Sequence, residues 1–108
     1  MRRNLDIGLV VINAGLLAND YLENLTASSV QALLDVNMYQ PTAMLKAFLP
    51  SLIERKEAKC GVILVSSVAG YNPLPKLQAY SATKAYVTYL ATAVETEMRK
   101  SGNDHIDW

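Results

Sequence analysis

A tyrosine and a lysine four positions apart, Tyr80 and Lys84, form the residue pair best suited to chemistry in this chain of 108 residues. On a helix, side chains at this spacing lie one turn apart on the same face. A free tyrosine holds its proton too tightly to exchange it readily at neutral pH, but a neighbouring ammonium group favours the phenolate. The pair therefore suits general acid–base work on a carbonyl oxygen whose carbon gains or loses a hydride.

Two polar residues follow apolar segments and could complete such a site. Ser67 lies thirteen residues before Tyr80, and Asn13 ends an earlier apolar segment. A serine hydroxyl could hydrogen-bond the same carbonyl oxygen and hold it in place. Taken singly, each feature also has an ordinary explanation as a helix-face pair, a turn asparagine or a capping serine. Their combination in this order favours a catalytic site.

Two short apolar segments rich in β-branched residues, 7–12 and 61–67, predict strands. Neither segment alternates polar with apolar residues, so we expect both strands to be buried on both faces in a parallel sheet. Ligands of such sheets bind beyond the carboxyl ends of the strands, which is where Asn13 and Ser67 lie.

Helical spacing of apolar residues predicts a long helix over 30–55, with its N-cap within 25–29 and a kink or break at Pro41. A second helix is expected over 77–99, after a loop with two prolines and before a C-cap at Gly102. The tail, 103–108, shows no pattern. The order β-α-β-α predicts an α/β fold, part of a doubly wound, Rossmann-like parallel sheet.

Two parallel strands leave backbone groups and apolar faces without partners. We therefore expect residues 1–108 to form a single incomplete domain that lacks N- and C-terminal strands, or one that another subunit covers.

From about Asp6 to Lys100, the sequence resembles the short-chain dehydrogenase/reductase family. Residues 11–15, Val-Ile-Asn-Ala-Gly, are similar to the family's Asn-Asn-Ala-Gly segment, which packs beside the adenine, with Ile12 in place of the first asparagine. The resemblance implies a dinucleotide-binding domain with NADP or NAD as cofactor. It implies the catalytic residues Asn37, Ser67, Tyr80 and Lys84, and the cofactor-binding residues Asn13, Ala14, Gly15, Val36, Tyr80 and Lys84.

The same resemblance implies a role for each catalytic residue. Tyr80 is the acid–base residue, Lys84 binds the nicotinamide ribose and tunes Tyr80, Ser67 orients the substrate, and Asn37 holds a relay water near the lysine. The reaction implied is hydride transfer between NAD(P)(H) and a carbonyl or secondary alcohol. Residues 66–70 and 72–75 are similar to those of hydroxysteroid dehydrogenases and 3-oxoacyl-CoA reductases, which suggests a steroid- or acyl-type substrate. The two long helices imply a homo-oligomer.

The sequence departs from the family in its glycines. The five glycines, at positions 8, 15, 61, 70 and 102, lack the spacing of the family's phosphate-binding turn. We therefore expect the isolated chain to bind a dinucleotide poorly. One alternative stays open, namely a catalytically silent family member that acts only through association of its helices.

Composition excludes several other classes of protein. Ten basic and ten acidic residues give a net charge of zero, which does not favour a nucleic-acid or anionic-membrane surface. The single Cys60 and single His105 predict no disulfide framework and no metal site, so we interpret them as a structural thiol and a surface residue. The longest apolar stretch, 7–18, is too short to span a membrane, and residues 1–6 do not begin a secretory signal. We expect an intracellular protein, cytoplasmic or associated with the endoplasmic reticulum.

Overall fold

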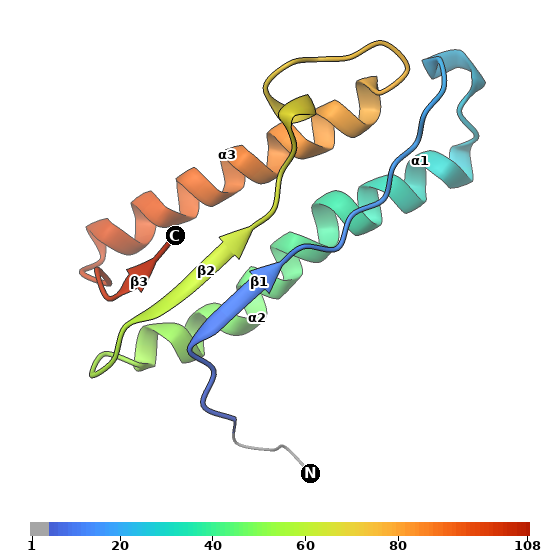
Figure 1. The fold of residues 1–108 in the computed structure, drawn as a ribbon. Helices are drawn as coiled ribbons and strands as arrows, with labels where there is room; N and C mark the ends of the chain where they lie inside the picture. The colour runs from blue at the N-terminus through green and yellow to red at the C-terminus, as the bar shows by residue number, and fades with distance from the viewer. Residues whose placement is uncertain (1–4) are drawn as a thin grey trace.

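In the part of the chain that the structure describes, three parallel strands form the sheet, in the order in which they occur in the sequence. The computed structural model describes residues 5–108, so residues 1–4, on which the expected lack of a secretory signal partly rests, lie outside the described part. The strands are β1 (Leu9–Ile12), β2 (Cys60–Leu64) and β3 (Ile106–Asp107). Their arrows run the same way in Figure 1, so their carboxyl ends lie at one end of the molecule. The predicted parallel α/β sheet is confirmed.

Strand β2 pairs with β1 over four residues, from Leu9 opposite Gly61 to Ile12 opposite Leu64. The main-chain pairing extends one step further, because the N–H of Val65 donates to the carbonyl of Ile12 at 3.0 Å. Both strands are therefore present where the sequence predicts them, although each is shorter.

Strand β3 corrects the expectation that the tail after residue 102 has no regular structure. Ile106 lies opposite Cys60 and Asp107 lies opposite Gly61, both in parallel register. A strand of two residues is too short to show any periodicity. Its existence depends on pairing with β2, 45 or more positions earlier in the chain, and no local pattern encodes it.

The first long helix is built in three consecutive parts. These are α1 (Ala27–Leu34), a π-helical turn (Asp35–Tyr39) and α2 (Gln40–Glu54). Its N-cap is Thr26, whose side-chain oxygen accepts a hydrogen bond from the N–H of Ser29 at 3.1 Å. A cap of this kind satisfies one of the amide donors that every helix start leaves unpaired. The predicted helix and its capping region are confirmed.

The irregularity predicted at Pro41 takes the form of the π-helical turn. Within it, the N–H of Gln40 donates to the carbonyl of Asp35, five residues earlier. Proline has no N–H, so residue 41 cannot supply the bond that the carbonyl of Asn37 would receive in an α-helix. The wider π-helical turn places this missing hydrogen bond at the junction with α2, where Pro41 lies in the first turn.

Helix α3 (Gln78–Lys100) matches the second predicted helix within one residue at each end. It ends in the expected way at Gly102, which has a φ of 78°. The N–H of Gly102 donates to the carbonyl of Arg99 at 3.1 Å, and that of Asn103 donates to Met98 at 2.9 Å. These two bonds define a Schellman C-cap. Within residues 5–108, no helix is both long and apolar enough to cross a membrane.

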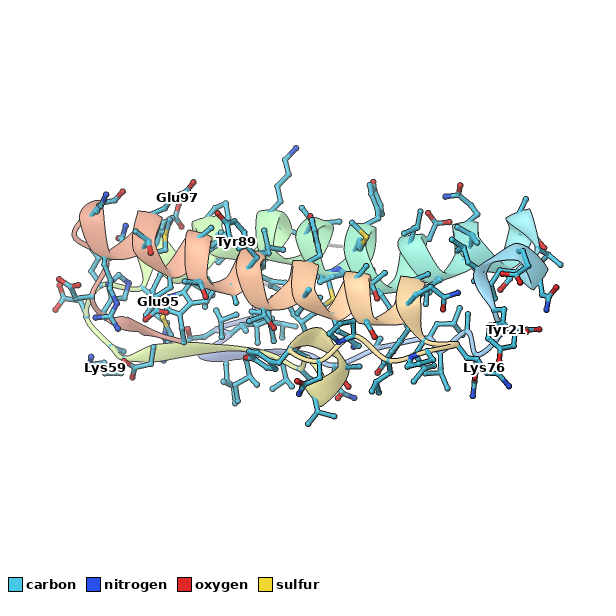
Figure 2. The ribbon with its side chains drawn as sticks, turned by 90° about the horizontal axis from the view of Figure 1, so that it is seen from above. Tyr21, Lys59, Lys76, Tyr89, Glu95 and Glu97 are labelled. Carbon is cyan, nitrogen blue, oxygen red and sulfur yellow. The ribbon has the colours of Figure 1, made fainter. Side chains whose placement is uncertain are left out.

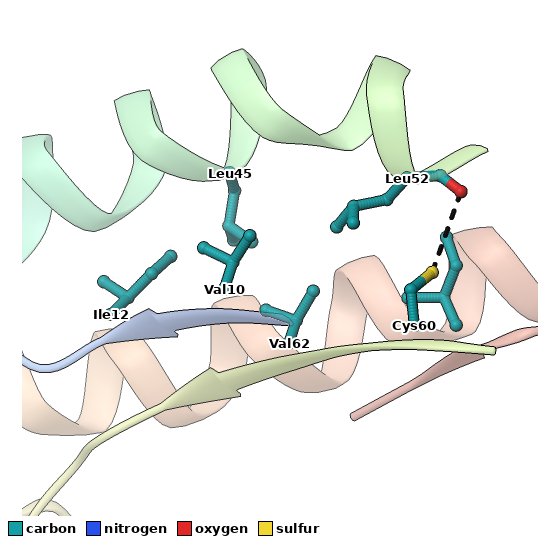
Figure 3. Packing of buried hydrophobic residues seen from close by; sticks show 7 residues of the cluster. Val10, Ile12, Leu45, Leu52, Cys60 and Val62 are labelled. Atoms are coloured by element: carbon teal, nitrogen blue, oxygen red, sulfur yellow. Dashed lines mark hydrogen bonds between the residues drawn. The ribbon is translucent and has the colours of Figure 1, made fainter. Parts of the chain in front are cut away.

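The hydrophobic core lies between one face of the sheet and the helices. Figure 3 shows side chains of β1 and β2 pointing toward Leu45 and Leu52 of α2. Each fully buried aliphatic side chain contributes about 1.5–3 kcal/mol relative to an exposed one. The buried members of this cluster are Val10, Ile12, Leu45, Leu52, Cys60, Val62 and Ile106.

The opposite face of the sheet is left uncovered by the residues that the structure describes, 5–108. Figure 2, a view from above, shows the helices on one side of the strands and side chains projecting freely on the other. Leu9, Val11 and Ile63 are 57%, 49% and 48% exposed, and they alternate with buried neighbours along the strands. The expectation that both strands are buried on both faces is therefore wrong for these residues, because both long helices pack on the same side.

His105 and Cys60 connect the end of α2 to the strands. The Nε2 atom of His105 donates to the carbonyl of Leu52 at 2.9 Å, and the N–H of Cys60 donates to the carbonyl of His105 at 3.1 Å. The interpretation of His105 as a surface residue is wrong, because its half-buried ring helps to close the end of the helix. Cys60 is buried, and this burial raises the pKa of its thiol, as expected for a structural residue.

Candidate active site

The predicted site residues gather at the carboxyl ends of β1 and β2. Figure 1 places the loops after both strands at the same end as the first turns of α1 and α3. Asn13, Ala14 and Gly15 follow β1 directly and are exposed. Ser67 follows β2, with the start of α3 packed beside it, and is half-buried. The sheet therefore brings the two loops to one edge, as its parallel topology requires.

Hydrogen bonds from hydroxyl groups hold the segment after β2 against α3. The hydroxyl of Ser66 donates to the carbonyl of Lys84 at 2.8 Å. The hydroxyl of Thr88, one turn further along α3, lies 2.9 Å from the Ser66 oxygen. These contacts fix the helical turn that carries Lys84 against the strand end.

Ser67 caps the short 3-10 turn Val68–Gly70. Its side-chain oxygen accepts a hydrogen bond from the N–H of Ala69 at 3.2 Å. A hydroxyl has one donor and two acceptor positions, so this bond does not use its proton. Ser67 can cap the turn and still donate to a substrate oxygen.

Gly70 lets this turn approach α3 closely. A Cβ atom at position 70 would lie 2.9 Å from the carbonyl carbon of Lys84 and 3.0 Å from its oxygen. Only a residue without a side chain fits against a helix backbone at this distance. The contact sets the distance between the loop that carries Ser67 and the helix that carries Lys84.

Asn37 is almost fully buried, at 1% exposure, on the π-helical turn. Its Oδ1 accepts from the N–H of Leu16 at 2.8 Å, and its Nδ2 donates to the carbonyl of Leu16 at 2.8 Å. The second Nδ2 hydrogen goes to the hydroxyl of Thr83 at 3.0 Å. The reverse orientation of the amide would set two donors against each other at Leu16, so the assignment is unambiguous.

These bonds limit how Asn37 could hold a relay water. Both of its side-chain donors are used within the protein, so a water cannot receive a hydrogen bond from this amide. Only the second lone pair of Oδ1 remains for one. The water-binding role that the family resemblance implies for the side chain therefore stays a prediction, while its structural role is to hold the loop after β1.

Lys84 is a buried cation with few partners. It is 4% exposed, and its Nζ makes one long hydrogen bond, 3.4 Å to the carbonyl of Val65. Among residues 5–108 its ammonium has no carboxylate within ion-pair distance. A Cβ atom at Gly15 would lie 3.2 Å from this Nζ and 3.8 Å from Oδ1 of Asn37, so Lys84 reaches the loop after β1.

Tyr80 lies one turn before Lys84, as the spacing predicts. The Nζ of Lys84 is 5.7 Å from the centre of the Tyr80 ring, and the tyrosine is half-buried. A cation at this distance from an aromatic ring is attracted to the ring electrostatically. The predicted pair therefore forms.

The loop before α3 is fastened to the segment after β1. Asp20 donates its N–H to the carbonyl of Lys76 at 3.0 Å, and Gln78 donates from Nε2 to the carbonyl of Asp20 at 3.2 Å. Lys76 adopts a left-handed backbone with a φ of 64°, and its ammonium lies 5.0 Å from the centre of the Tyr21 ring (Figure 2). These contacts hold the start of α3 two residues before Tyr80.

Some predicted relationships are not tested by these contacts. In the described part of the chain, no hydrogen bond joins Ser67 to Tyr80, so a carbonyl-sized gap shared by both hydroxyls and Lys84 stays a prediction. Val36 is half-buried beside Asn37, and its place in cofactor binding also stays a prediction.

Sequence reasoning missed the hydroxyl groups that support the site. Thr83 lies inside the Tyr80–Lys84 spacing and bonds to Asn37, while Ser66 lies directly before Ser67 and bonds to Lys84. Their positions within or beside the recognised residues are the available signal. The partners that give them a role are 46 and 18 positions away, and no local pattern identifies these partners.

The arrangement suits a ligand that carries oxygen atoms. An ammonium group has three donors, and burying it is unfavourable unless acceptors surround it. Lys84 uses one donor weakly, beside a loop of small, exposed residues at positions 14 and 15. A sugar hydroxyl could approach here, and the residues therefore fit the ribose end of a dinucleotide. Within residues 5–108, no three His, Cys, Asp or Glu side chains gather as a metal site requires.

Comparisons with known proteins identify relatives over nearly the whole chain. A family profile described as short chain dehydrogenase matches residues 2–106. The inactive hydroxysteroid dehydrogenase-like protein 1 of Pongo abelii is 31% identical over 99 residues, covering 90% of this chain and 29% of that protein. The very-long-chain 3-oxoacyl-CoA reductase of Mus musculus is 32% identical over 104 residues, covering 91% of this chain and 32% of that protein.

The fold is shared with solved structures. A short chain dehydrogenase/reductase from Burkholderia phymatum, in complex with NAD, superposes with a TM-score of 0.86 at 25% identity. The match covers 92% of this chain and 34% of that one. The chain therefore spans about a third of the length of these relatives.

Proposed function

Since the chain belongs to the short-chain dehydrogenase family, we propose that it forms the catalytic centre of an NAD(P)-dependent oxidoreductase. The substrate is a carbonyl compound or a secondary alcohol. The observation that carries the proposal is the buried Lys84 ammonium, which lies beside both the Tyr80 ring and the loop after β1 and has a single weak hydrogen-bond partner among residues 5–108. A buried cation with unused donors next to a phenol is an arrangement that core packing alone does not explain.

Each residue has a defined part in the proposed reaction. The hydroxyl of Tyr80 donates a proton to the carbonyl oxygen during reduction and takes it back during oxidation. The ammonium of Lys84 stabilises the phenolate left behind. Ser67 donates a hydrogen bond to the same oxygen and holds it in place. A nicotinamide nucleotide, when bound, supplies or accepts the hydride.

Residues after β1 and on α3 would hold the cofactor. Ala14 has a small side chain and Gly15 has none, so a nucleotide can approach their backbone closely. Lys84 supplies hydrogen-bond donors for the ribose hydroxyls. The NAD bound to the Burkholderia phymatum relative supports NAD or NADP for this chain. The five glycines do not provide a phosphate-binding turn within these 108 residues, so we expect weak binding of the isolated chain. The named relatives favour a steroid- or acyl-type substrate.

The test compares two tyrosines of the same helix. Tyr80→Phe removes the proposed proton donor, whereas Tyr89→Phe removes a hydroxyl from a side chain that is 80% exposed. We expect the first variant to reduce turnover of NADH or NADPH with a carbonyl substrate by about 10²–10⁴-fold. The second should leave turnover unchanged. Equal turnover in Tyr80→Phe and the unsubstituted chain would contradict the proposal.

A second candidate function is association without catalysis. Relatives named inactive support it, as does an apolar groove of about 300 Å³ between the two long helices. The groove is lined in part by Leu34, Met38 and Tyr86, and also by Tyr39, which is 73% exposed. A homo-oligomer formed through these helices would bury this groove.

Two measurements separate the candidates. Saturable binding of NADH, followed by fluorescence, together with turnover supports the enzyme. A folded chain that shows no binding but sediments as a dimer supports association alone. In that case Tyr39→Glu, which places a charge in the lining of the groove, should shift the dimer to monomer. An unchanged sedimentation profile for this variant would exclude the helices as the interface.

A further inference from the structure

We propose that Thr83 is a positioning residue, which transmits the position of Asn37 to the helical turn that bears Tyr80 and Lys84. Thr83 is 1% exposed and makes two hydrogen bonds with fixed roles. Its hydroxyl donates to the carbonyl of Tyr80 at 2.7 Å and accepts from Nδ2 of Asn37 at 3.0 Å. An amide nitrogen has no lone pair to accept with, so the direction of both bonds follows from the chemistry of the groups.

The other threonines of α3 show that this geometry is specific to position 83. Thr88, Thr92 and Thr96 each bond to the carbonyl four residues earlier, at 3.2, 3.1 and 2.8 Å. That bond is the ordinary local arrangement of a threonine in a helix. Thr83 instead bonds three residues back. Among the threonines of α3, only Thr83 has a hydroxyl that accepts a hydrogen bond from another helical segment. Helix formation alone does not require this bond.

The bonds link three parts of the site in series. The loop after β1 is held at Leu16 by Asn37, Asn37 is held by Thr83, and Thr83 is held to the carbonyl of Tyr80. Every atom in the series is at least partly buried, so water does not readily replace these bonds. Lys84 follows Thr83 directly and reaches back to Gly15, one residue before Leu16. This series of hydrogen bonds therefore sets the distance between the Lys84 ammonium and the loop after β1.

Loss of the Thr83 hydroxyl has a specific consequence. A buried Nδ2 hydrogen of Asn37 is left without an acceptor, so the side chain must turn or admit water. Either response loosens its two bonds to Leu16, while strand pairing in β1 and β2 is untouched. The effect should therefore be local to the loop and the Tyr80–Lys84 turn.

The experiment uses the full chain and three variants. Thr83→Val replaces the hydroxyl with a methyl group of similar size, Thr83→Ser retains the hydroxyl, and Thr92→Val removes an exposed hydroxyl from the same helix. Amide hydrogen exchange, measured by NMR, should be about tenfold faster or more at Leu16 in Thr83→Val. Thr83→Ser and Thr92→Val should match the unsubstituted chain, and Val62 in β2 serves as the internal reference for global stability.

Unchanged exchange at Leu16 in Thr83→Val overturns the proposal, as does a rise of the same size at Leu16 and Val62. If Thr83→Val does not fold, Thr83→Ala is measured against the same criteria, since it removes the hydroxyl without adding a methyl group beside Asn37. The exchange measurement does not depend on turnover, so it tests whether Thr83 holds the loop even for a chain without activity.

The catalytic consequence rests on the proposed function and has its own readout. We expect kcat for carbonyl reduction to fall about tenfold in Thr83→Val, with restoration by Thr83→Ser and little change in KM for the carbonyl substrate. Absence of turnover in the unsubstituted chain would refute the proposed function alone. Faster exchange at Leu16 with an unchanged kcat would instead show that Thr83 holds the loop without affecting the reaction, which overturns its positioning role.

Discussion

Gly70 and Gly8 allow one prediction to be tested, namely that an added methyl group costs more stability against a rigid backbone than against a flexible side chain. A Cβ atom at Gly70 would lie 2.9 Å from the carbonyl carbon of Lys84, which belongs to the backbone of α3. A Cβ atom at Gly8 would lie 2.9 Å from Nη1 of Arg55, at the far end of a flexible side chain. Both substitutions to alanine therefore begin with the same overlap.

The expected costs differ because only one neighbour can move easily. Carbon atoms in ordinary contact are about 3.5–4.0 Å apart, so in Gly70→Ala the turn and α3 must separate by at least about half an ångström. Overpacking of this kind costs about 1–3 kcal/mol. In Gly8→Ala the guanidinium can turn aside, which weakens at most an ion pair with the exposed Asp6 that is worth about 0–1 kcal/mol. Alanine stiffens the unfolded chain in both variants, so this gain cancels in the comparison.

Urea unfolding followed by far-ultraviolet circular dichroism measures the difference directly. We expect Gly70→Ala to be less stable than Gly8→Ala by about 1–3 kcal/mol, which is a large share of the roughly 5–15 kcal/mol that holds a domain folded. The melting temperatures should separate by about 4–8 °C for each kcal/mol. Equal unfolding midpoints for the two variants would refute the argument that the 3-10 turn packs tightly on the backbone of α3.

Three further predictions concern a cap, a cofactor contact and a thiol. Thr26→Ala removes the acceptor for the N–H of Ser29 and should lower the free energy of unfolding by about 1 kcal/mol in the same urea assay. Gly15→Ala places a methyl group 3.2 Å from the Lys84 ammonium, so NADH affinity measured by fluorescence titration should fall while stability changes little. Burial raises the pKa of the Cys60 thiol, so its contribution to stability is complete below the ordinary value of 9.0 and is lost as the pH rises through the higher folded-state value. The unfolding free energy of the unsubstituted chain, measured from neutral pH upward, should therefore fall relative to that of Cys60→Ala.

Local sequence patterns predicted the elements that are long and regular. The apolar runs before Asn13 and Ser67 mark β1 and β2 because β-branched residues cluster there, and Gly102 marks the end of α3 because it adopts a positive φ. Strand β3 could not be found in this way. Its two residues are a strand only because Cys60 and Gly61 pair with them.

The candidate site shows the same division between local and distant information. The spacing of Tyr80 and Lys84 correctly places both on one face of a helix, since helix geometry is local. The π-helical turn is centred on Asn37, whose partners Leu16 and Thr83 lie 21 and 46 positions away. No local pattern identifies such partners. The burial of the strands was overestimated for a related reason. Apolar residues on both faces of a strand indicate that both faces need to be covered, but they do not show whether the covering elements are among these residues.

The uncovered face of the sheet has a consequence for the life of this chain in a cell. Leu9, Val11 and Ile63 form an exposed apolar surface. Chaperones bind proteins that expose surfaces of this kind, and quality-control proteases degrade them. A second surface that covers these three side chains would remove their exposed area from water, and the stability gained would add to that of the packing beneath α2.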